Sequence, residues 1–296
     1  MKLAPIALFV YDRPDHVRAT LAALAANPAA GESDLFVFSD GPRDAGAQQA
    51  VATVRGIVGS VRGFRGVTVS EREANAGLVR SITDGVDRLT REYGRVIVLE
   101  DDLITAPRFL EFMNLALDRY EDESRVMQIS GYMYPVPTQA AACLLPTVSC
   151  WGWATWRRAW QFYDAAGQAR GLIQNDAAMR KAFDLDGAYD YADLLERHLN
   201  GDASSWGVLW YLSVFARHGL VLHPPQSLVS NYGFDGSGNH RSVEGQGGLG
   251  RVELSGARGD FVFPAEIAVD ETAFGLVKNS LRRSHRGWRN LLRRWM

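Results

Sequence analysis

Several features are scarce or missing in this 296-residue chain. It has only two cysteines, Cys143 and Cys150, which excludes a disulfide scaffold, and their spacing matches no zinc-binding motif. We expect free thiols in a reducing cytoplasm. No window holds about 18 uninterrupted apolar residues, so no membrane-spanning helix is expected. Internal repeats and low-complexity linkers are also missing, which favours one main domain.

An excess of one charge is missing as well. The chain has 32 Lys and Arg against 34 Asp and Glu, a net charge of −2. This balance gives no reason to expect nucleic acid as a partner. The opening residues, MKLAPIALFVYDRPDH, have one Lys, a short apolar run and no small-residue cleavage site. We therefore expect a first strand there rather than a signal peptide.

What the chain does contain is a regular alternation of two patterns over residues 1–130. Short β-rich runs predict strands at 5–11, 34–40, 66–73, 95–100 and 125–130. Apolar residues at helical spacing predict helices at 13–27, 47–61, 75–94 and 107–122. This order predicts an α/β fold, with a mostly parallel sheet flanked by helices.

Polar residues follow three of these strands. Tyr11-Asp12-Arg13 follows the first, Ser39-Asp40-Gly41 the second, and Glu100-Asp101-Asp102 the fourth, within RVIVLEDDLI. Ligands of such sheets bind beyond the carboxyl ends of the strands. Adjacent carboxylates repel each other unless a cation is present, and Mg²⁺ or Mn²⁺ prefers oxygen ligands. The triplet thus predicts a metal site that neutralises a diphosphate, the alternative being a solvated acidic loop.

Six segments in order carry a resemblance. They are FVYDRPDHVRATLAAL, FSDGPR, NAGLVRSITDGV, VLEDD, CWGWATWRRAW and NYGFDGSGNH, spread over about residues 4–241. Together they resemble glycosyltransferases of the GT-A fold, and among these the bacterial sugar transferases related to the N-acetylglucosaminyltransferase I type. The resemblance implies a Rossmann-like sheet, a DXD-like acidic motif, Mn²⁺ or Mg²⁺, and a UDP-, GDP- or dTDP-sugar donor. It implies a nucleotide-binding half at 1–130 and an acceptor half at 131–265.

The resemblance also assigns roles to residues. Asp102 would ligate the metal, while Glu100 and Asp101 would contact ribose, donor sugar or metal-bound water. The base and ribose would lie against Arg13 and Asp40, and Asn75 and Arg80 would flank the nucleotide. The glycine-rich loop of GFDGSGNHR would bring His240, and also Asp235, to the metal or phosphates. Alternatives remain open: Asp40 as a turn-forming residue, Arg80 and His240 as solvated side chains.

The catalytic base is where the chain departs from the resemblance. An inverting transferase needs a carboxylate near the acceptor hydroxyl. Similar proteins have Asp directly before the Ser-Trp of SWGVLW, but this chain reads NGDASSWGVLW, with Ser204 in that place. Asp202, two residues earlier, is the candidate base. It could instead cap the following helix, expected at 205–219.

Four of the eight Trp residues lie within residues 150–160. Spacing of i, i+3 and i+7 for Trp153, Trp156 and Trp160 favours a helix packed into the core. Trp151, beside Gly152, is the candidate for stacking on a sugar ring.

Residues 276–296 hold seven Lys and Arg and no acid, which leaves a charge of −9 on the rest of the chain. With Leu281, Trp288, Leu292 and Trp295 near one stripe, we expect a basic amphipathic helix within a tail at 266–296, bound to an anionic membrane surface. A disordered end, or a helix docked on the acidic body, is the alternative.

These observations predict a metal-dependent, inverting glycosyltransferase that builds a bacterial surface glycan such as lipopolysaccharide, capsule or exopolysaccharide. It would act in the cytoplasm, peripherally on the inner face of the membrane, on a glycan or lipid-linked glycan acceptor. A sugar nucleotidylyltransferase would need a glycine-rich loop after the first strand, which YDRPDHVR does not provide. The alternative function from a different class is that of a non-catalytic sugar-binding or scaffold protein derived from a transferase. Ser204, in place of the expected catalytic Asp, is the reason to retain this alternative.

Overall fold

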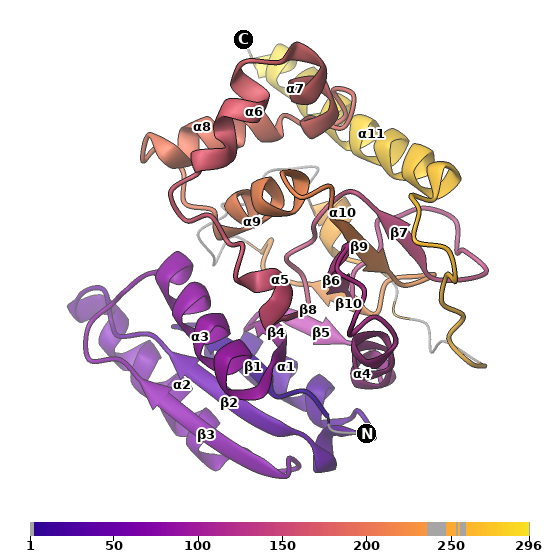
Figure 1. The fold of residues 1–296 in the computed structure, drawn as a ribbon. Coiled ribbons are helices and arrows are strands. Elements are labelled where there is room, and N and C mark those ends of the chain that lie inside the picture. Colours follow the sequence, from indigo (N-terminus) through magenta and orange to yellow (C-terminus); the bar gives the residue numbers. More distant parts are fainter. Residues whose placement is uncertain (1–2, 236–246, 253, 255–258, 296) are drawn as a thin grey trace.

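The computed structural model describes the whole chain except residues 1–2, 236–246, 253, 255–258 and 296 (Figure 1). A large sheet of eight strands runs through the described part, in the order β3-β2-β1-β4-β8-β6-β9-β7. The strands are β1 (Ile6–Val10), β2 (Asp34–Ser39), β3 (Gly66–Glu71), β4 (Arg95–Glu100), β6 (Val126–Ser130), β7 (Cys143–Leu145), β8 (Trp153–Trp156) and β9 (Leu220–His223).

Most of this sheet is parallel. Strands β3, β2, β1 and β4 pair in parallel, as do β6 and β9, whereas β8 and β7 are antiparallel to their neighbours. The predicted α/β class, with a mostly parallel sheet flanked by helices, is confirmed. All five strands predicted in residues 1–130 are present, because each is a β-rich run bounded by turn residues.

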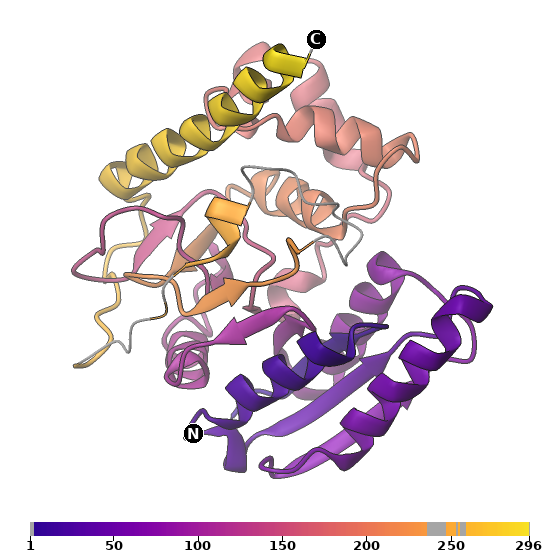
Figure 2. The same ribbon diagram turned by 180° about the vertical axis from the view of Figure 1, so that it is seen from behind.

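Helices cover both faces of the first four strands. α1 (Pro14–Ala25) and α2 (Gln48–Ser60) contact each other on one face, which Figure 2 turns to the viewer, and α3 (Leu78–Tyr93) lies on the other. Gly85 lets α3 approach the sheet, since a Cβ atom there would meet the ring of Phe9. α3 ends at Gly94, whose φ of 82° is left-handed, as the sequence predicts.

Helix α4 (Phe109–Arg119) follows β5 (Leu103–Thr105), and α9 (Trp206–Phe215) packs on α3. The other helices of the second half are α5 (Arg157–Trp160), α6 (Gly171–Gln174), α7 (Ala177–Phe183), α8 (Tyr191–Leu199), α10 (Gly247–Gly250) and the long C-terminal α11 (Glu271–Trp295). Short 3₁₀ helices are η1 (Ala30–Glu32), η2 (Ala45–Ala47) and η3 (Gln168–Arg170). A separate two-stranded sheet joins β5 to β10 (Val229–Asn231) in antiparallel register.

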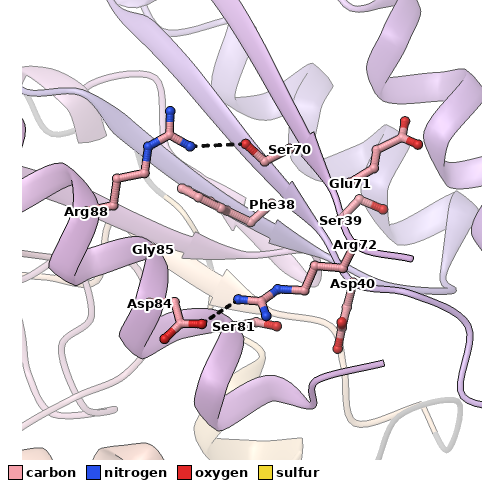
Figure 3. Close-up of a pocket in the computed structure, with 10 residues that line it drawn as sticks. All are labelled: Phe38, Ser39, Asp40, Ser70, Glu71, Arg72, Ser81, Asp84, Gly85 and Arg88. Atoms are coloured by element: carbon pink, nitrogen blue, oxygen red, sulfur yellow. Dashed lines mark hydrogen bonds and ion pairs between the residues drawn. The ribbon is translucent and has the colours of Figure 1, made fainter. Parts of the chain in front are cut away.

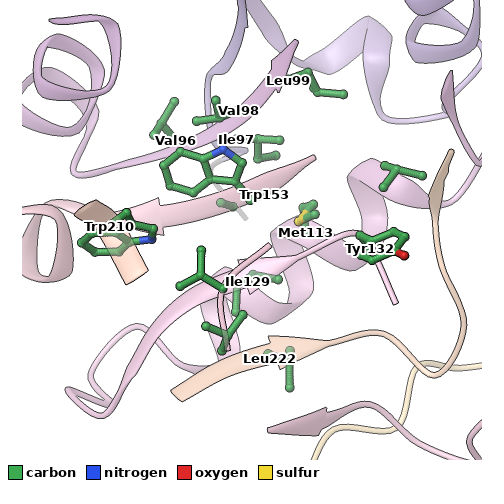
Figure 4. Close-up of a cluster of buried hydrophobic side chains, with 14 of the residues drawn as sticks. Val96, Ile97, Val98, Leu99, Met113, Ile129, Tyr132, Trp153, Trp210 and Leu222 are labelled. Carbon is green, nitrogen blue, oxygen red and sulfur yellow. The ribbon is translucent and has the colours of Figure 1, made fainter. Parts of the chain in front are cut away.

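The prediction of one helix through the Trp-rich stretch is wrong. Trp153 and Trp156 lie in strand β8, and only Trp160 lies in a helix, α5. Core burial of these three side chains is nevertheless confirmed, with none more than 3% exposed. Trp153 packs among Val96 to Leu99 of β4, Ile129 and Trp210, at the centre of the core in Figure 4. Residues 153–156 form a strand because they pair with the edge of β4, which would otherwise be unpaired.

The C-terminal helix α11 begins at Glu271, five residues before the basic stretch. Its first turns are docked on the body through buried Ala273, Val277 and Leu281, and Lys278 pairs with Asp186 at 2.7 Å. The predicted C-terminal helix is present, and its N-terminal part follows the docked alternative. In the described residues no helix has the length and hydropathy to span a bilayer.

Candidate functional site

The acidic triplet lies at the junction of the two sheets. Glu100 is the last residue of β4 in the large sheet, and Asp101 and Asp102 form the turn into β5 of the small sheet. Because β4 pairs with β1 at the end of the four-stranded parallel block, this turn is at the carboxyl edge of that block, where a ligand is expected. The structure therefore places the three acids as the sequence predicts.

Arg13 is the cation that meets these acids. Its Nη2 donates to Oδ1 of Asp101 and, at 3.0 Å, to Oδ2 of Asp102. The backbone N–H of Tyr11 donates to the other oxygen of Asp101 at 3.2 Å. Arg13 thus lies at the acidic turn, whereas the resemblance implies a place against the base and ribose.

One arginine leaves the triplet with excess negative charge. Burial, together with the charges of Asp102 and Asp101, raises the pKa of Glu100 to about 8. Burial also raises the pKa of Asp101 to about 6, against the lowering effect of Arg13. The Glu100 carboxylate accepts no hydrogen bond from the described residues. A cation placed here would relieve this repulsion.

The donor set also fits a hard divalent cation, since carboxylate oxygens are its preferred ligands. Within the described ranges no three His, Cys, Asp or Glu side chains are grouped so as to hold a metal ion by themselves. A metal at Asp102 would therefore complete its shell with oxygen atoms of a ligand, as Mg²⁺ does with phosphates. His240, the second predicted ligand, lies outside the described residues.

Residues 232–235 cover the acidic turn. The N–H of Tyr232 donates to the carbonyl of Asp102 at 2.9 Å. A Cβ atom at Gly233 would overlap Oδ2 of Asp102, so only glycine fits this approach. Asp235 reaches back to α1, with its Oδ2 at 3.2 Å from Nε2 of His16. We call residues 232–235 the covering segment.

Asp40 follows β2 at the same edge and holds the loop before α3. Its carboxylate accepts the N–H groups of Gly41 at 2.9 Å, Ala76 at 2.9 Å and Gly77 at 2.8 Å. Asn75 completes the connection by donating to the carbonyl of Gly41 at 2.9 Å. The N–H of Ala76 also reaches the second oxygen of Asp40 at 3.2 Å. These bonds make Asp40 a loop-forming residue, the alternative named above, and they take up its roughly four lone-pair sites.

A cavity of about 210 Å³ lies beside Asp40, between α3 and the ends of β2 and β3. Figure 3 shows its lining: Phe38, Ser39, Asp40, Ser70, Glu71, Arg72, Ser81, Asp84, Gly85 and Arg88. The buried hydroxyl of Ser81 has no hydrogen-bond partner in the structure. Arg72, paired with Asp84 at 2.7 Å, is a lining residue that was not among the predicted site residues. It follows β3 as Asp40 follows β2, so the strand-end rule could have found it.

Arg80 is not drawn into this cavity. Its side chain is 71% exposed, and it pairs with Asp84 at 3.6 Å on the outer surface of α3. This placement agrees with the solvated-helix alternative.

Trp151 lies next to the covering segment. Its ring packs edge-on against Tyr132, with centroids 4.6 Å apart, and against Phe234 at 5.7 Å. Unlike the other Trp residues of its cluster it is only partly buried. The structure thus brings Trp151 to the same side as Asp102 through Phe234.

Asp202 lies on the exposed loop between α8 and α9, and its N–H donates to the carbonyl of Arg197 at 2.8 Å. The cap of α9 is Ser205, whose Oγ accepts the N–H of Val208 at 3.3 Å. The alternative that Asp202 caps this helix is therefore wrong. Nothing in the described contacts joins Asp202 to the acidic turn.

No family model matches the chain, and no curated protein matches it. Among solved structures, it is similar to the mannosyltransferase PcManGT from Pyrobaculum calidifontis in complex with GDP-Man and Mn²⁺, with 11% identity, a TM-score of 0.40, and coverage of 72% of this chain and 68% of that one. It is also similar to S. aureus TarS, with 14% identity, a TM-score of 0.39, and coverage of 76% of this chain and 36% of that one, so the chain spans about a third of TarS. A third similar structure is a cytidylyltransferase from Leptospira borgpetersenii, with 13% identity, a TM-score of 0.35, and coverage of 56% of this chain and 65% of that one. Likenesses this distant assign no activity.

Proposed function

We propose that the chain is a metal-dependent, inverting glycosyltransferase of the GT-A fold that uses a nucleotide-sugar donor. The observation that carries this proposal is the convergence of Glu100, Asp101 and Asp102 at one strand end, with Arg13 as their counter-ion. The excess negative charge suits a divalent cation that carries a diphosphate. The six sequence segments that resemble this class of enzyme support the same reading.

Asp102 would hold Mn²⁺ or Mg²⁺, with His240 as a second ligand. When bound, the cation would stabilise the negative charge of the departing nucleoside diphosphate. Both oxygens of Asp101 already accept hydrogen bonds, from Tyr11 and Arg13. Asp101 would therefore hold the turn in addition to contacting ribose or metal-bound water. The Glu100 carboxylate is the one left to accept a hydroxyl of the donor.

The nucleoside would lie along the edge formed by β1, β2 and β3. Arg13, Asp40 and Asn75 would meet it there, and the cavity beside Asp40 offers an aromatic ring, Phe38, in its lining. Arg80 would flank the nucleotide from α3. A volume of about 210 Å³ has room for a planar base, and the free hydroxyl of Ser81 offers it a hydrogen bond.

Asp202 is the proposed catalytic base, which would take the proton of the acceptor hydroxyl as the new bond forms. The test is Asp202→Asn, with the exposed Asp122→Asn as its control. A fall in turnover of about a hundredfold or more, without weaker donor binding, is expected for loss of a general base. Unchanged turnover would remove Asp202 from this role.

The acceptor would be a bacterial surface glycan, such as lipopolysaccharide, capsule or exopolysaccharide, or its lipid-linked precursor. Trp151 would stack on a sugar ring. The basic tail would hold the enzyme on the inner face of the cytoplasmic membrane, where each Lys or Arg contributes about 1 kcal/mol. Co-sedimentation of the full chain with anionic but not neutral vesicles is the expected result, and equal recovery with both would reject this part.

A non-catalytic sugar-binding or scaffold protein is the second candidate. Ser204, in the position where similar proteins have Asp, favours it. Such a protein would bind a sugar without turning over any nucleotide sugar, whatever the metal.

The deciding experiment is a thermal-shift panel with UDP, GDP, dTDP and CMP, each with and without Mn²⁺. A ligand at about 100 times its Kd adds about 2.7 kcal/mol of stability, which is readily measured. The proposal predicts a metal-dependent shift with one nucleotide, which Asp102→Asn removes. If no nucleotide shifts the melting temperature, the donor site does not exist and the enzyme proposal falls.

A further inference from the structure

Both carbonyl groups of the acidic turn are held by hydrogen bonds from distant parts of the chain. The hydroxyl of Thr20, in α1, donates to the carbonyl of Asp101 at 2.8 Å. The N–H of Tyr232, in the covering segment, donates to the carbonyl of Asp102 at 2.9 Å. Turn carbonyls are ordinarily left to water. Thr20 is fully buried, so water has no access from its side.

Thr20 uses its hydroxyl differently from other helical threonines of this chain. Thr53, Thr83 and Thr90 each donate to a carbonyl four residues earlier in their own helix. That local bond is the usual choice of a helical Thr. Thr20 instead reaches a residue 81 positions away. The long-range bond therefore serves the turn rather than the helix.

Thr20 is also part of one stripe of α1. His16 and Thr20 are four positions apart and share a helix face, and Arg13 is the cap residue directly before the helix. Arg13 contacts the carboxylates of the turn, His16 contacts Asp235, and Thr20 contacts the turn backbone. The cap residue of α1 thus holds the side chains of the acidic turn, and one face of the helix contacts the backbone of the turn and the covering segment.

We propose that Thr20 is a positioning residue, which fixes the direction in which the carboxylate of Asp102 points. The peptide unit between Asp101 and Asp102 is planar, so a bond to its oxygen restrains rotation of the whole unit. That rotation sets where the Cα–Cβ bond of Asp102 is aimed. The inference rests on the proposed function, in which Asp102 is the metal ligand.

The test compares Thr20→Val, which keeps the shape and loses the donor, with Thr20→Ser, which keeps the donor. Thr90→Val is the matched control, because Thr90 is a buried threonine whose bond stays within α3. The first readout is the Kd for Mn²⁺ in the presence of the nucleotide that the thermal-shift panel selects. We expect about tenfold weaker binding for Thr20→Val, the size typical of lost support to a metal ligand, and near-parental values for Thr20→Ser and Thr90→Val.

The second readout is hydrogen exchange of the backbone across residues 100–105, which needs no ligand. Thr20→Val should exchange faster there than the parent, and Thr20→Ser should not. If Thr20→Val does not fold, Thr20→Cys replaces it, since a thiol is a weak donor. Parental exchange and parental Kd in the folded variant would overturn the inference. A parent that binds no metal with any nucleotide rejects the proposed function instead, and exchange still decides whether Thr20 holds the turn.

Discussion

Gly233 lies directly against the carboxylate of Asp102, with no room for a side chain between them. Alanine at 233 would force either Oδ2 of Asp102 or the covering segment to move. Overpacking of this kind typically costs about 1–3 kcal/mol, and here it falls on the proposed metal ligand. Gly233→Ala should therefore lose the metal-dependent thermal shift while remaining folded.

The control for this substitution is Gly59→Ala in α2. A Cβ atom there would meet nothing within 4 Å, and alanine is the better helix former by about 1 kcal/mol. Its nucleotide response should equal that of the parent. If the Gly233→Ala protein keeps the full metal-dependent shift, Asp102 is not part of the metal site.

Glu100 should make the metal-free protein less stable as the pH rises. Its pKa in the folded chain is about 8, above the unfolded value near 4.3, because burial and the neighbouring carboxylates oppose its charge. A raised pKa means that stability is complete at low pH and is lost as the pH climbs from about 4.5 to 8. Asp101, at about 6, adds to the loss in the lower part of this range.

Glu100→Gln should remove the Glu100 part of that loss. We expect it to be more stable than the parent at pH 8 and equal to it near pH 4.5, in urea unfolding with a chelator present. A constant difference between the two proteins across this range would mean that the folded chain does not hold Glu100 uncharged.

Asp40→Asn should destabilise the fold. The Asp40 carboxylate accepts hydrogen bonds from the N–H groups of Ala76 and Gly77, whereas the side chain of Asn has only one acceptor oxygen. Hydrogen bonds to a charged group typically contribute about 1.5–3 kcal/mol, and the loss is to be measured by urea unfolding. Asp15→Asn is the control, because the Asp15 side chain is 93% exposed. Equal stability of the two variants would argue that the loop does not depend on Asp40.

Docking of α11 should depend on apolar contacts and not on its ion pair. Leu281 is 3% exposed, and truncation of a buried Leu to Ala typically costs about 2–5 kcal/mol. Lys278 pairs with Asp186, whose side chain is 44% exposed, and such pairs contribute about 0–1 kcal/mol. Leu281→Ala should therefore lower the unfolding free energy far more than Lys278→Met. The reverse order would assign the docking to charge.

The first half of the fold could be predicted because its signals are local. Each of the five strands predicted in residues 1–130 is a β-rich run of five or more residues, and each helix has an apolar stripe, as in Ile82, Val86 and Leu89. The three-residue strands β5, β7 and β10 were missed, since so short a run carries no periodicity. The Trp-rich stretch was misassigned because partners far along the chain, β4 and β6, decide that it is a strand.

The candidate site shows the same division. The position of Glu100, Asp101 and Asp102 follows from strand order alone. The bonds of Arg13 to the acids do not, because they depend on how α1 is rotated over the sheet. The contact of Gly233 with Asp102 joins residues 131 positions apart, so no local pattern contains it.

The place of β8 has a consequence for the growing chain on the ribosome. β6 leaves the exit tunnel before β8, yet β8 is the strand that joins β6 to β4. Until residues 153–156 emerge, the exposed edge of β4 is open to unwanted strand pairing. The first four strands can pair with one another early. The acidic turn is complete only after β10 has paired with β5 and the covering segment has been made. A nascent chain stalled before residue 229 would thus carry all three acids without a finished site.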